Sequence, residues 1–177
     1  FYWSEDRALD IKESFTSVIN KCKEEKAELL LISGDLFDTN NVSNLYQNLV
    51  KDVIISNPHI LFFYLKGNHD NNSFLSCLDE IPNNLMLFDE DWTSYDLGNG
   101  IVITGIELTP DNSRVMSDSL LLEADKLNIV MLHGQESQYK SGDKAEVIAI
   151  SELKNKGIDF HFYAVADAEY QQVRESE

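Results

Sequence analysis

Three short apolar runs in this sequence each lead into a small polar cluster that contains a glycine. Apolar residues on both sides of such a run are typical of a strand that is buried on both faces, as in a parallel sheet. A strand of this kind needs helices to cover it, so the chain is restricted to folds in which strands alternate with helices. The runs are residues 29–32, 60–65 and 129–132.

The residues between these runs supply helices and a hairpin. Apolar residues recur at helical spacing over residues 8–22, and a second amphipathic stretch covers residues 42–56. Gly98-Asn99-Gly100 predicts a hairpin, because these residues adopt positive φ at little cost. We predict further helices near residues 73–78, 119–126 and 149–156, and further strands at residues 85–88, 93–97, 101–108 and 160–165. The pattern is that of an α/β fold with helices outside and mixed sheets inside, in a single domain over residues 1–177.

Composition narrows the classes of function. The chain has 31 acidic and 14 basic residues, a net charge of −17, which opposes free attraction to nucleic acid or to an anionic membrane. Nothing in the spacing of Cys22 and Cys77 pairs them, so a reducing cytoplasm is the expected location. No apolar run approaches the ~20 residues that span a bilayer, so we expect no membrane association.

The three polar clusters follow the three buried strands, at the edge of an α/β sheet where ligands bind. Each cluster contributes an oxygen or imidazole donor, and each glycine allows a sharp turn that aims the donor inward. An aspartate, an asparagine and a histidine that converge suit Mn²⁺, Zn²⁺ or Fe²⁺ better than Ca²⁺, which rarely accepts imidazole. The clusters are residues 34–38, 67–70 and 133–134.

These clusters resemble the motifs of the calcineurin-like metallophosphoesterases and, within them, the SbcD-like DNA repair exonucleases. The resemblance covers nearly the whole chain. It implies a β-sandwich of mixed sheets flanked by helices, and two divalent metal ions, Mn²⁺ by preference with Fe²⁺ or Zn²⁺ as alternatives. The stretches that carry it are Gly34-Asp35-Leu36-Phe37-Asp38, Gly67-Asn68-His69-Asp70, His133-Gly134-Gln135 and Lys156-Gly157-Ile158-Asp159.

The resemblance also implies a role for each candidate site residue. Asp35 would bridge the two metals, and Asn68 and His133 would bind the second metal. His69 would lie beside the scissile phosphate, as a general acid or as a stabiliser of the charge in the transition state. Asp38 and Asp70 would contact these groups without binding a metal themselves, and Asp70 could orient the imidazole of His69.

The sequence departs from the family pattern at both ends. The family begins with a strand that ends in Asp-x-His, and this sequence starts in the helix that follows, so the expected fold lacks its first strand. Where the family has Gly-His-x-His, the sequence reads Ala166-Asp167-Ala168-Glu169. Asp167 and Glu169 could replace the imidazoles as oxygen ligands of Mn²⁺, or they could be solvated end residues. The chain is then either an excerpt of a larger enzyme, which the complete Gly67–Asp70 motif favours, or a degenerate relative.

Two functions remain open at this point. The first is a two-metal phosphodiesterase, a DNA exonuclease or endonuclease subunit of the SbcD-like type, with DNA or a smaller phosphodiester as substrate. Such enzymes work with an SMC-like ATPase and carry a DNA-capping region that this sequence lacks, and a homodimer is a further expectation. The second is a catalytically impaired phosphoesterase fold that serves as a scaffold for a partner protein.

Overall fold

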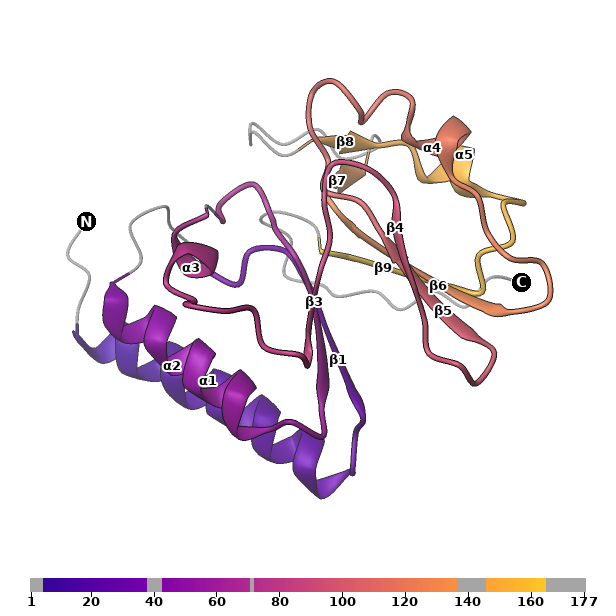
Figure 1. Ribbon diagram of the computed structural model, residues 1–177. Coiled ribbons are helices and arrows are strands. Elements are labelled where there is room, and N and C mark those ends of the chain that lie inside the picture. The colour runs from indigo at the N-terminus through magenta and orange to yellow at the C-terminus, as the bar shows by residue number, and fades with distance from the viewer. Residues whose placement is uncertain (1–4, 38–42, 71, 137–145, 165–177) are drawn as a thin grey trace. The chain divides into compact units, whose positions relative to one another are not determined.

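Helices and short strands alternate over residues 5–87, and after that, in the parts of the chain that the structure describes, strands follow one another without an intervening helix in two places (Figure 1). The computed structural model describes residues 5–37, 43–70, 72–136 and 146–164. The helices are α1 (Glu5–Glu24), α2 (Asn44–Ser56), α3 (Ser73–Ser76), α4 (Met116–Ser119) and α5 (Ile150–Leu153). The strands are β1 (Leu29–Ser33), β2 (Leu61–Leu65), β3 (Leu85–Leu87), β4 (Thr93–Asp96), β5 (Ile101–Gly105), β6 (Leu127–His133), β7 (Gln135–Glu136), β8 (Val147–Ile148) and β9 (Phe160–Ala164).

The strands form parallel and mixed sheets, which confirms the predicted α/β class. One sheet has the order β1-β2-β3, a second the order β4-β5-β6-β9, and β7 pairs with β8. No helix within the described parts of the chain is both long and apolar enough to cross a membrane. The expectation of a missing first strand stays a prediction.

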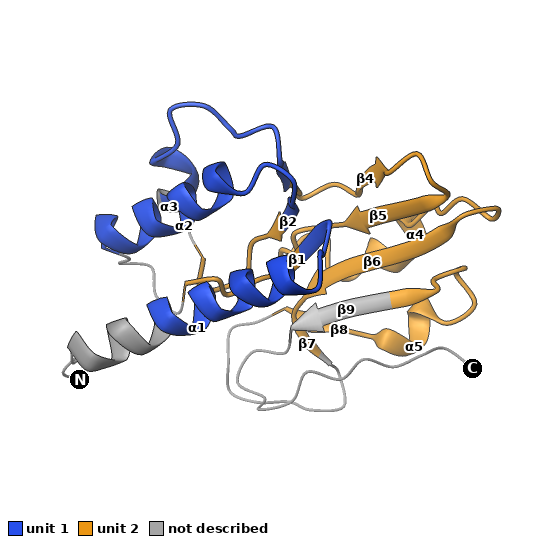
Figure 2. Cartoon of the chain, turned by 90° about the horizontal axis from the view of Figure 1, so that it is seen from below, with its two compact units in different colours: residues 1–30, 42–63, 73–86 blue, residues 31–41, 64–72, 87–177 orange. Residues whose placement is uncertain are grey.

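The chain divides into two compact units, which Figure 2 shows in different colours. Unit 1 comprises residues 1–30, 42–63 and 73–86, and unit 2 comprises residues 31–41, 64–72 and 87–177. The expectation of a single domain over the whole chain stays a prediction.

Unit 1 contains α1, α2 and α3. The buried face of α2 consists of Gln47, Val50 and Ile54, at the three- and four-residue spacing of an amphipathic helix. The side-chain amide of Asn84 donates to the carbonyl oxygens of Ile54, Asn57 and Ile60, at 2.9–3.2 Å. One buried amide therefore satisfies the carbonyls exposed where the helix ends and the chain turns toward β2.

Unit 2 is built around the mixed sheet of β4, β5, β6 and β9. β5 pairs antiparallel with β4 and parallel with β6, and β6 pairs parallel with β9. Gly98 and Gly100 have φ values of 76° and 84°, and they close the predicted hairpin between β4 and β5. A core of seven buried apolar residues packs within this unit: Ile106, Met116, Leu120, Val130, Leu132, Ile148 and Leu153.

The predicted helix over residues 119–126 is wrong. The structure has only the single turn of α4 at Met116–Ser119, and residues 121–126 are not helical. The reason is a local side-chain contact, because the side-chain amide of Asn128 donates at 2.8 Å to the carbonyl oxygens of both Glu123 and Lys126. These carbonyls are thus satisfied without a helix, and local helix propensity does not decide the conformation.

Candidate functional site

Three of the predicted ligand residues come together in unit 2. The Nε2 atom of His133 lies 2.8 Å from Oδ1 of Asn68 and 3.4 Å from Oδ2 of Asp35. The three residues follow or end β1, β2 and β6, so one donor comes from each of the three predicted strands. The convergence that the sequence predicts is therefore present in the structure.

The contact of the other ring nitrogen of His133 determines the tautomer of the imidazole. Nδ1 lies 3.1 Å from the carbonyl oxygen of Ser33, which can only accept a hydrogen bond, so Nδ1 carries the proton. In the neutral imidazole, Nε2 then presents a lone pair toward the amide of Asn68. An imidazolium, an amide turned to present its NH₂ group, or a cation bound by both atoms makes this short contact favourable.

The spacing of the three donor atoms suits a single divalent ion. Two ligands that bind one ion at about 2.0–2.2 Å, at angles between octahedral and tetrahedral, lie about 2.8–3.6 Å apart. The contacts of 2.8 and 3.4 Å fall within this range. Among the described residues there is no group of three or more His, Cys, Asp or Glu side chains that could hold a metal. The cluster here contains two such side chains, and the third donor is the amide oxygen of Asn68.

Asp35 adopts an unusual backbone conformation. Its φ is 50°, in the left-handed region that aspartate enters more readily than most residues, although at a cost in free energy. Its Oδ1 atom accepts a hydrogen bond of 3.1 Å from the backbone N–H of His69, and its Oδ2 faces His133. The conformation thus lets one carboxylate contact both the loop after β2 and the end of β6.

Gly34 and Gly67 are required because other residues approach them closely. A Cβ atom on Gly34 would lie 2.1 Å from Nδ1 of His133, and a Cβ atom on Gly67 would lie 2.2 Å from Oδ1 of Asp35. Of these two glycines, only Gly34 has a positive φ, of 83°. The sharp turn expected at each glycine is therefore found at Gly34, whereas at Gly67 the close approach of Asp35 explains the residue.

We expect Gly34→Ala to destabilise the protein more than Gly100→Ala. The two glycines have nearly the same φ, 83° and 84°, but nothing lies within 4 Å of a Cβ atom at Gly100. Gly100→Ala should cost about 1–2 kcal/mol for the left-handed backbone alone. Gly34→Ala should cost about 1–3 kcal/mol more, because the methyl group collides with His133. Urea denaturation of both variants measures the difference, and equal losses would show that the contact with His133 is absent.

Asp70 joins the loop after β1 to the loop after β2. Its carboxylate accepts hydrogen bonds from the backbone N–H groups of Leu36, Phe37 and Gly67, at 3.3, 2.9 and 3.0 Å. Burial raises the pKa of Asp70, and the hydrogen bonds from Gly67 and Phe37 oppose that rise. These contacts position the main chain on both sides of the site. Orientation of the His69 imidazole by Asp70 stays a prediction.

Asn68 and His133 also line a cavity of about 290 Å³. Its other walls carry more negative than positive side chains: Asp70, Glu90, Glu107 and Glu146 against Lys66. A phosphate group that entered this cavity would meet net negative charge unless bound cations compensated for it.

Sequence reasoning missed two residues beside the site, Lys66 and Glu107. The Nζ atom of Lys66 lies 2.9 Å from Oε2 of Glu107, and the two side chains are only 25% and 12% exposed. Burial raises the pKa of Glu107, while its contacts with Lys66 oppose that rise. The signal that could have revealed them is a charged residue just after each of two apolar strands, at the edge where the site lies.

Several predicted residues lie outside the part of the chain that the structure describes. These are Asp38, which follows β1, and Asp167 and Glu169, which follow β9. Their predicted contributions to the site therefore stay predictions.

This fold and this arrangement of donors at the strand ends define a class of protein. The profile of the calcineurin-like phosphoesterase family matches residues 10–164, so the chain belongs to that family. Proteins of the family generally use two divalent metal ions.

One similar protein is the DNA double-strand break repair protein Mre11 of Methanosarcina mazei. It is 27% identical over 183 aligned residues, which cover 92% of this chain and 28% of that protein. The chain thus spans little more than a quarter of the length of this relative.

Proposed function

We propose that the protein hydrolyses phosphodiesters with two divalent metal ions and acts as a nuclease of the SbcD-like type. The observation that carries this proposal is that an amide oxygen of Asn68 and a carboxylate oxygen of Asp35 lie 2.8 and 3.4 Å from the same imidazole nitrogen of His133. Membership of the calcineurin-like phosphoesterase family and similarity to a DNA double-strand break repair protein support it.

Asp35, Asn68 and His133 hold the metals in this proposal. Asp35 would be shared by the two ions, and Asn68 and His133 would together hold one of them. When bound, the ions supply Lewis-acid stabilisation of the phosphate charge and make water nucleophilic at neutral pH. The Nδ1–H bond to the carbonyl of Ser33 keeps the imidazole of His133 in the tautomer whose Nε2 can bind a cation. Mn²⁺ is the preferred ion, with Fe²⁺ or Zn²⁺ as alternatives.

His69 is the proposed acid. Its backbone N–H is bound to Asp35, so the residue stays beside the carboxylate. From this place its imidazole donates a proton to the leaving oxygen or stabilises the negative charge of the transition state. Asp70 holds the loop that carries His69, through its bonds to the main chain of Gly67, Leu36 and Phe37.

The charge of the chain limits how it can engage DNA. With a net charge of −17, binding of a long polyanion requires contacts supplied by a partner, such as an SMC-like ATPase, or by a further region of the protein. A small phosphodiester needs less basic surface, because the metals neutralise its single charge. DNA is the first substrate to test, and a small diester is the second.

The test is hydrolysis of bis-(p-nitrophenyl) phosphate and of single- and double-stranded DNA, with Mn²⁺ and with EDTA. We expect hydrolysis with Mn²⁺, its loss in EDTA and its return when Mn²⁺ is added in excess. Asn68→Ala should abolish it, whereas Asn99→Ala, in the exposed turn between β4 and β5, should not. Hydrolysis that survives EDTA or Asn68→Ala would contradict the proposal. A folded protein without hydrolysis would favour the scaffold that binds a partner protein.

A further inference from the structure

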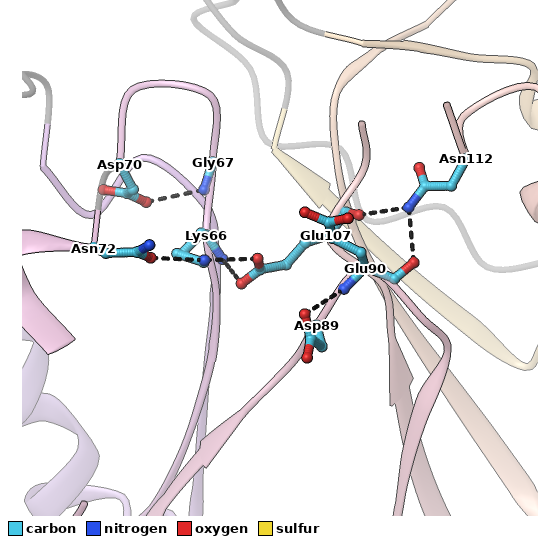
Figure 3. A network of polar contacts seen from close by, with 8 residues as sticks. All are labelled: Lys66, Gly67, Asp70, Asn72, Asp89, Glu90, Glu107 and Asn112. Carbon is cyan, nitrogen blue, oxygen red and sulfur yellow. Dashed lines mark hydrogen bonds and ion pairs between the residues drawn. The ribbon is translucent and has the colours of Figure 1, made fainter. Parts of the chain in front are cut away.

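Glu107 is a buried carboxylate that the proposed mechanism does not use. It follows β5, and the residue is only 9% exposed. Its backbone N–H donates to the carbonyl oxygen of Asp89 at 2.8 Å, and its own carbonyl accepts from the side-chain amide of Asn112 at 2.9 Å. Asn112 also donates to the carbonyl of Glu90 at 2.8 Å (Figure 3). The main chain of Glu107 is therefore fixed, and its carboxylate projects from a rigid position.

That carboxylate contacts Lys66 in two places. Oε2 lies 2.9 Å from Nζ of Lys66, and Oε1 accepts a hydrogen bond of 3.4 Å from the backbone N–H of Lys66. The Glu107 carboxylate therefore fixes both the backbone and the ammonium group of Lys66. Figure 3 shows the lysine side chain between Glu107 and Asn72.

Lys66 stands at the start of the loop that carries Asn68 and His69. Its ammonium group also donates to Oδ1 of Asn72 at 3.0 Å, so one side chain joins the two ends of the loop. Within the loop, the backbone N–H of Gly67 donates to the carboxylate of Asp70 at 3.0 Å. The loop that carries Asn68 is thus closed by contacts of Lys66 and of Gly67, and Glu107 contacts Lys66 from outside the loop.

A largely buried ion pair of this kind, with side chains 25% and 12% exposed, has a physical cost. Removing two charges from water is unfavourable, and an apolar pair of similar volume is often at least as stable. The pair is therefore poorly explained as a source of stability. Substitution of a residue that contacts a metal ligand and orients it commonly lowers metal affinity by about 10–100-fold.

We propose that Glu107 is a positioning residue, which acts through Lys66 to hold Asn68 where it can share a metal ion with Asp35 and His133. This inference rests on the proposed function, because it assumes that these three residues bind a metal.

The test is the Mn²⁺ affinity of the full protein, measured without substrate from the EPR signal of free Mn²⁺. We expect Glu107→Ala to weaken binding about 10–100-fold. Glu107→Gln keeps an oxygen that can accept from Lys66, and it should recover most of the affinity. Lys66→Met should weaken binding like Glu107→Ala, and the double variant should lose no more than either single variant, because both act through one chain of contacts.

Two controls separate positioning from general stability. Asp96→Ala removes an ion pair with Lys126 of 2.7 Å in the same unit, away from the loop, and should leave Mn²⁺ affinity unchanged. Leu153→Ala lowers the thermal midpoint by opening the core of unit 2, and it should also leave the affinity unchanged.

The outcomes distinguish this inference from the proposed function. If the unsubstituted protein binds no Mn²⁺, both are wrong. If the unsubstituted protein binds Mn²⁺, and both Glu107→Ala and Glu107→Gln bind it as tightly as the unsubstituted protein does, only the positioning role is wrong. The thermal midpoint of each variant is measured beside its Mn²⁺ affinity. If Leu153→Ala lowers the midpoint as much as Glu107→Ala does and also weakens Mn²⁺ binding as much, the effect is one of stability and the positioning role is again wrong.

Discussion

Asp35→Asn is expected to abolish Mn²⁺ binding at the proposed site and to lower phosphodiester hydrolysis by about 10³-fold or more, since bound metals contribute several kcal/mol to stabilising the transition state. The substitution removes the negative charge of the carboxylate and leaves a side chain of nearly the same size. Asparagine also tolerates the left-handed conformation that Asp35 adopts at φ 50°, and it keeps an oxygen that can accept from the N–H of His69. The measurements are kcat on a diester substrate and bound Mn²⁺ per chain after desalting.

The matched control for this prediction is Asp91→Asn, which removes one negative charge from an exposed position in the same unit. It should leave both measurements unchanged. If Asp35→Asn retained bound Mn²⁺ and full hydrolysis, Asp35 would not be a metal ligand, and its backbone conformation would need another explanation.

His69→Gln is expected to lower kcat by about 10²–10⁴-fold, the usual contribution of a positioned acid or base, while Mn²⁺ binding stays unchanged. The backbone N–H of residue 69 remains available to Asp35, so the loop should keep its position. Kinetics with Mn²⁺, paired with a binding titration of the same variant, separates a group that acts on the substrate from one that binds the metal.

His59→Gln is the corresponding control, because His59 is exposed and follows Pro58 in unit 1. Its kcat should equal that of the unsubstituted protein. A loss of Mn²⁺ binding in His69→Gln would make His69 a ligand, and an unchanged kcat would remove it from the mechanism.

Much of the site could be predicted from local sequence because its geometry follows from strand ends. The runs that precede Gly34 and Gly67 form β1 and β2, and the third run forms β6. Strands present their carboxyl ends, and the loops that bind ligands, at one edge of an α/β sheet, which is why the three clusters are expected to converge. In the structure β1 and β2 belong to one sheet and β6 to another, so the contact of His133 with Asp35 and Asn68 joins the ends of strands from two sheets, which the local sequence does not specify.

The features that escaped prediction depend on side-chain contacts, one of them local and the others between residues far apart in the sequence. Residues 119–126 have a helical pattern, but Asn128 satisfies the carbonyls of Glu123 and Lys126 from outside the segment. The requirement for glycine at position 67 comes from Asp35, which lies far away in the sequence. The pairing of Lys66 with Glu107 likewise joins residues 41 positions apart, and no local pattern specifies such a contact.

We propose above all that Asp35, Asn68 and His133 bind one metal ion together. The most direct measurement is a crystal structure of the protein with Mn²⁺, with the ion located from its anomalous scattering. We predict a peak about 2 Å from Oδ1 of Asn68, from Nε2 of His133 and from a carboxylate oxygen of Asp35. The absence of an ion within reach of these three atoms, or a direct hydrogen bond between Asn68 and His133 that persists at saturating Mn²⁺, would contradict this assignment.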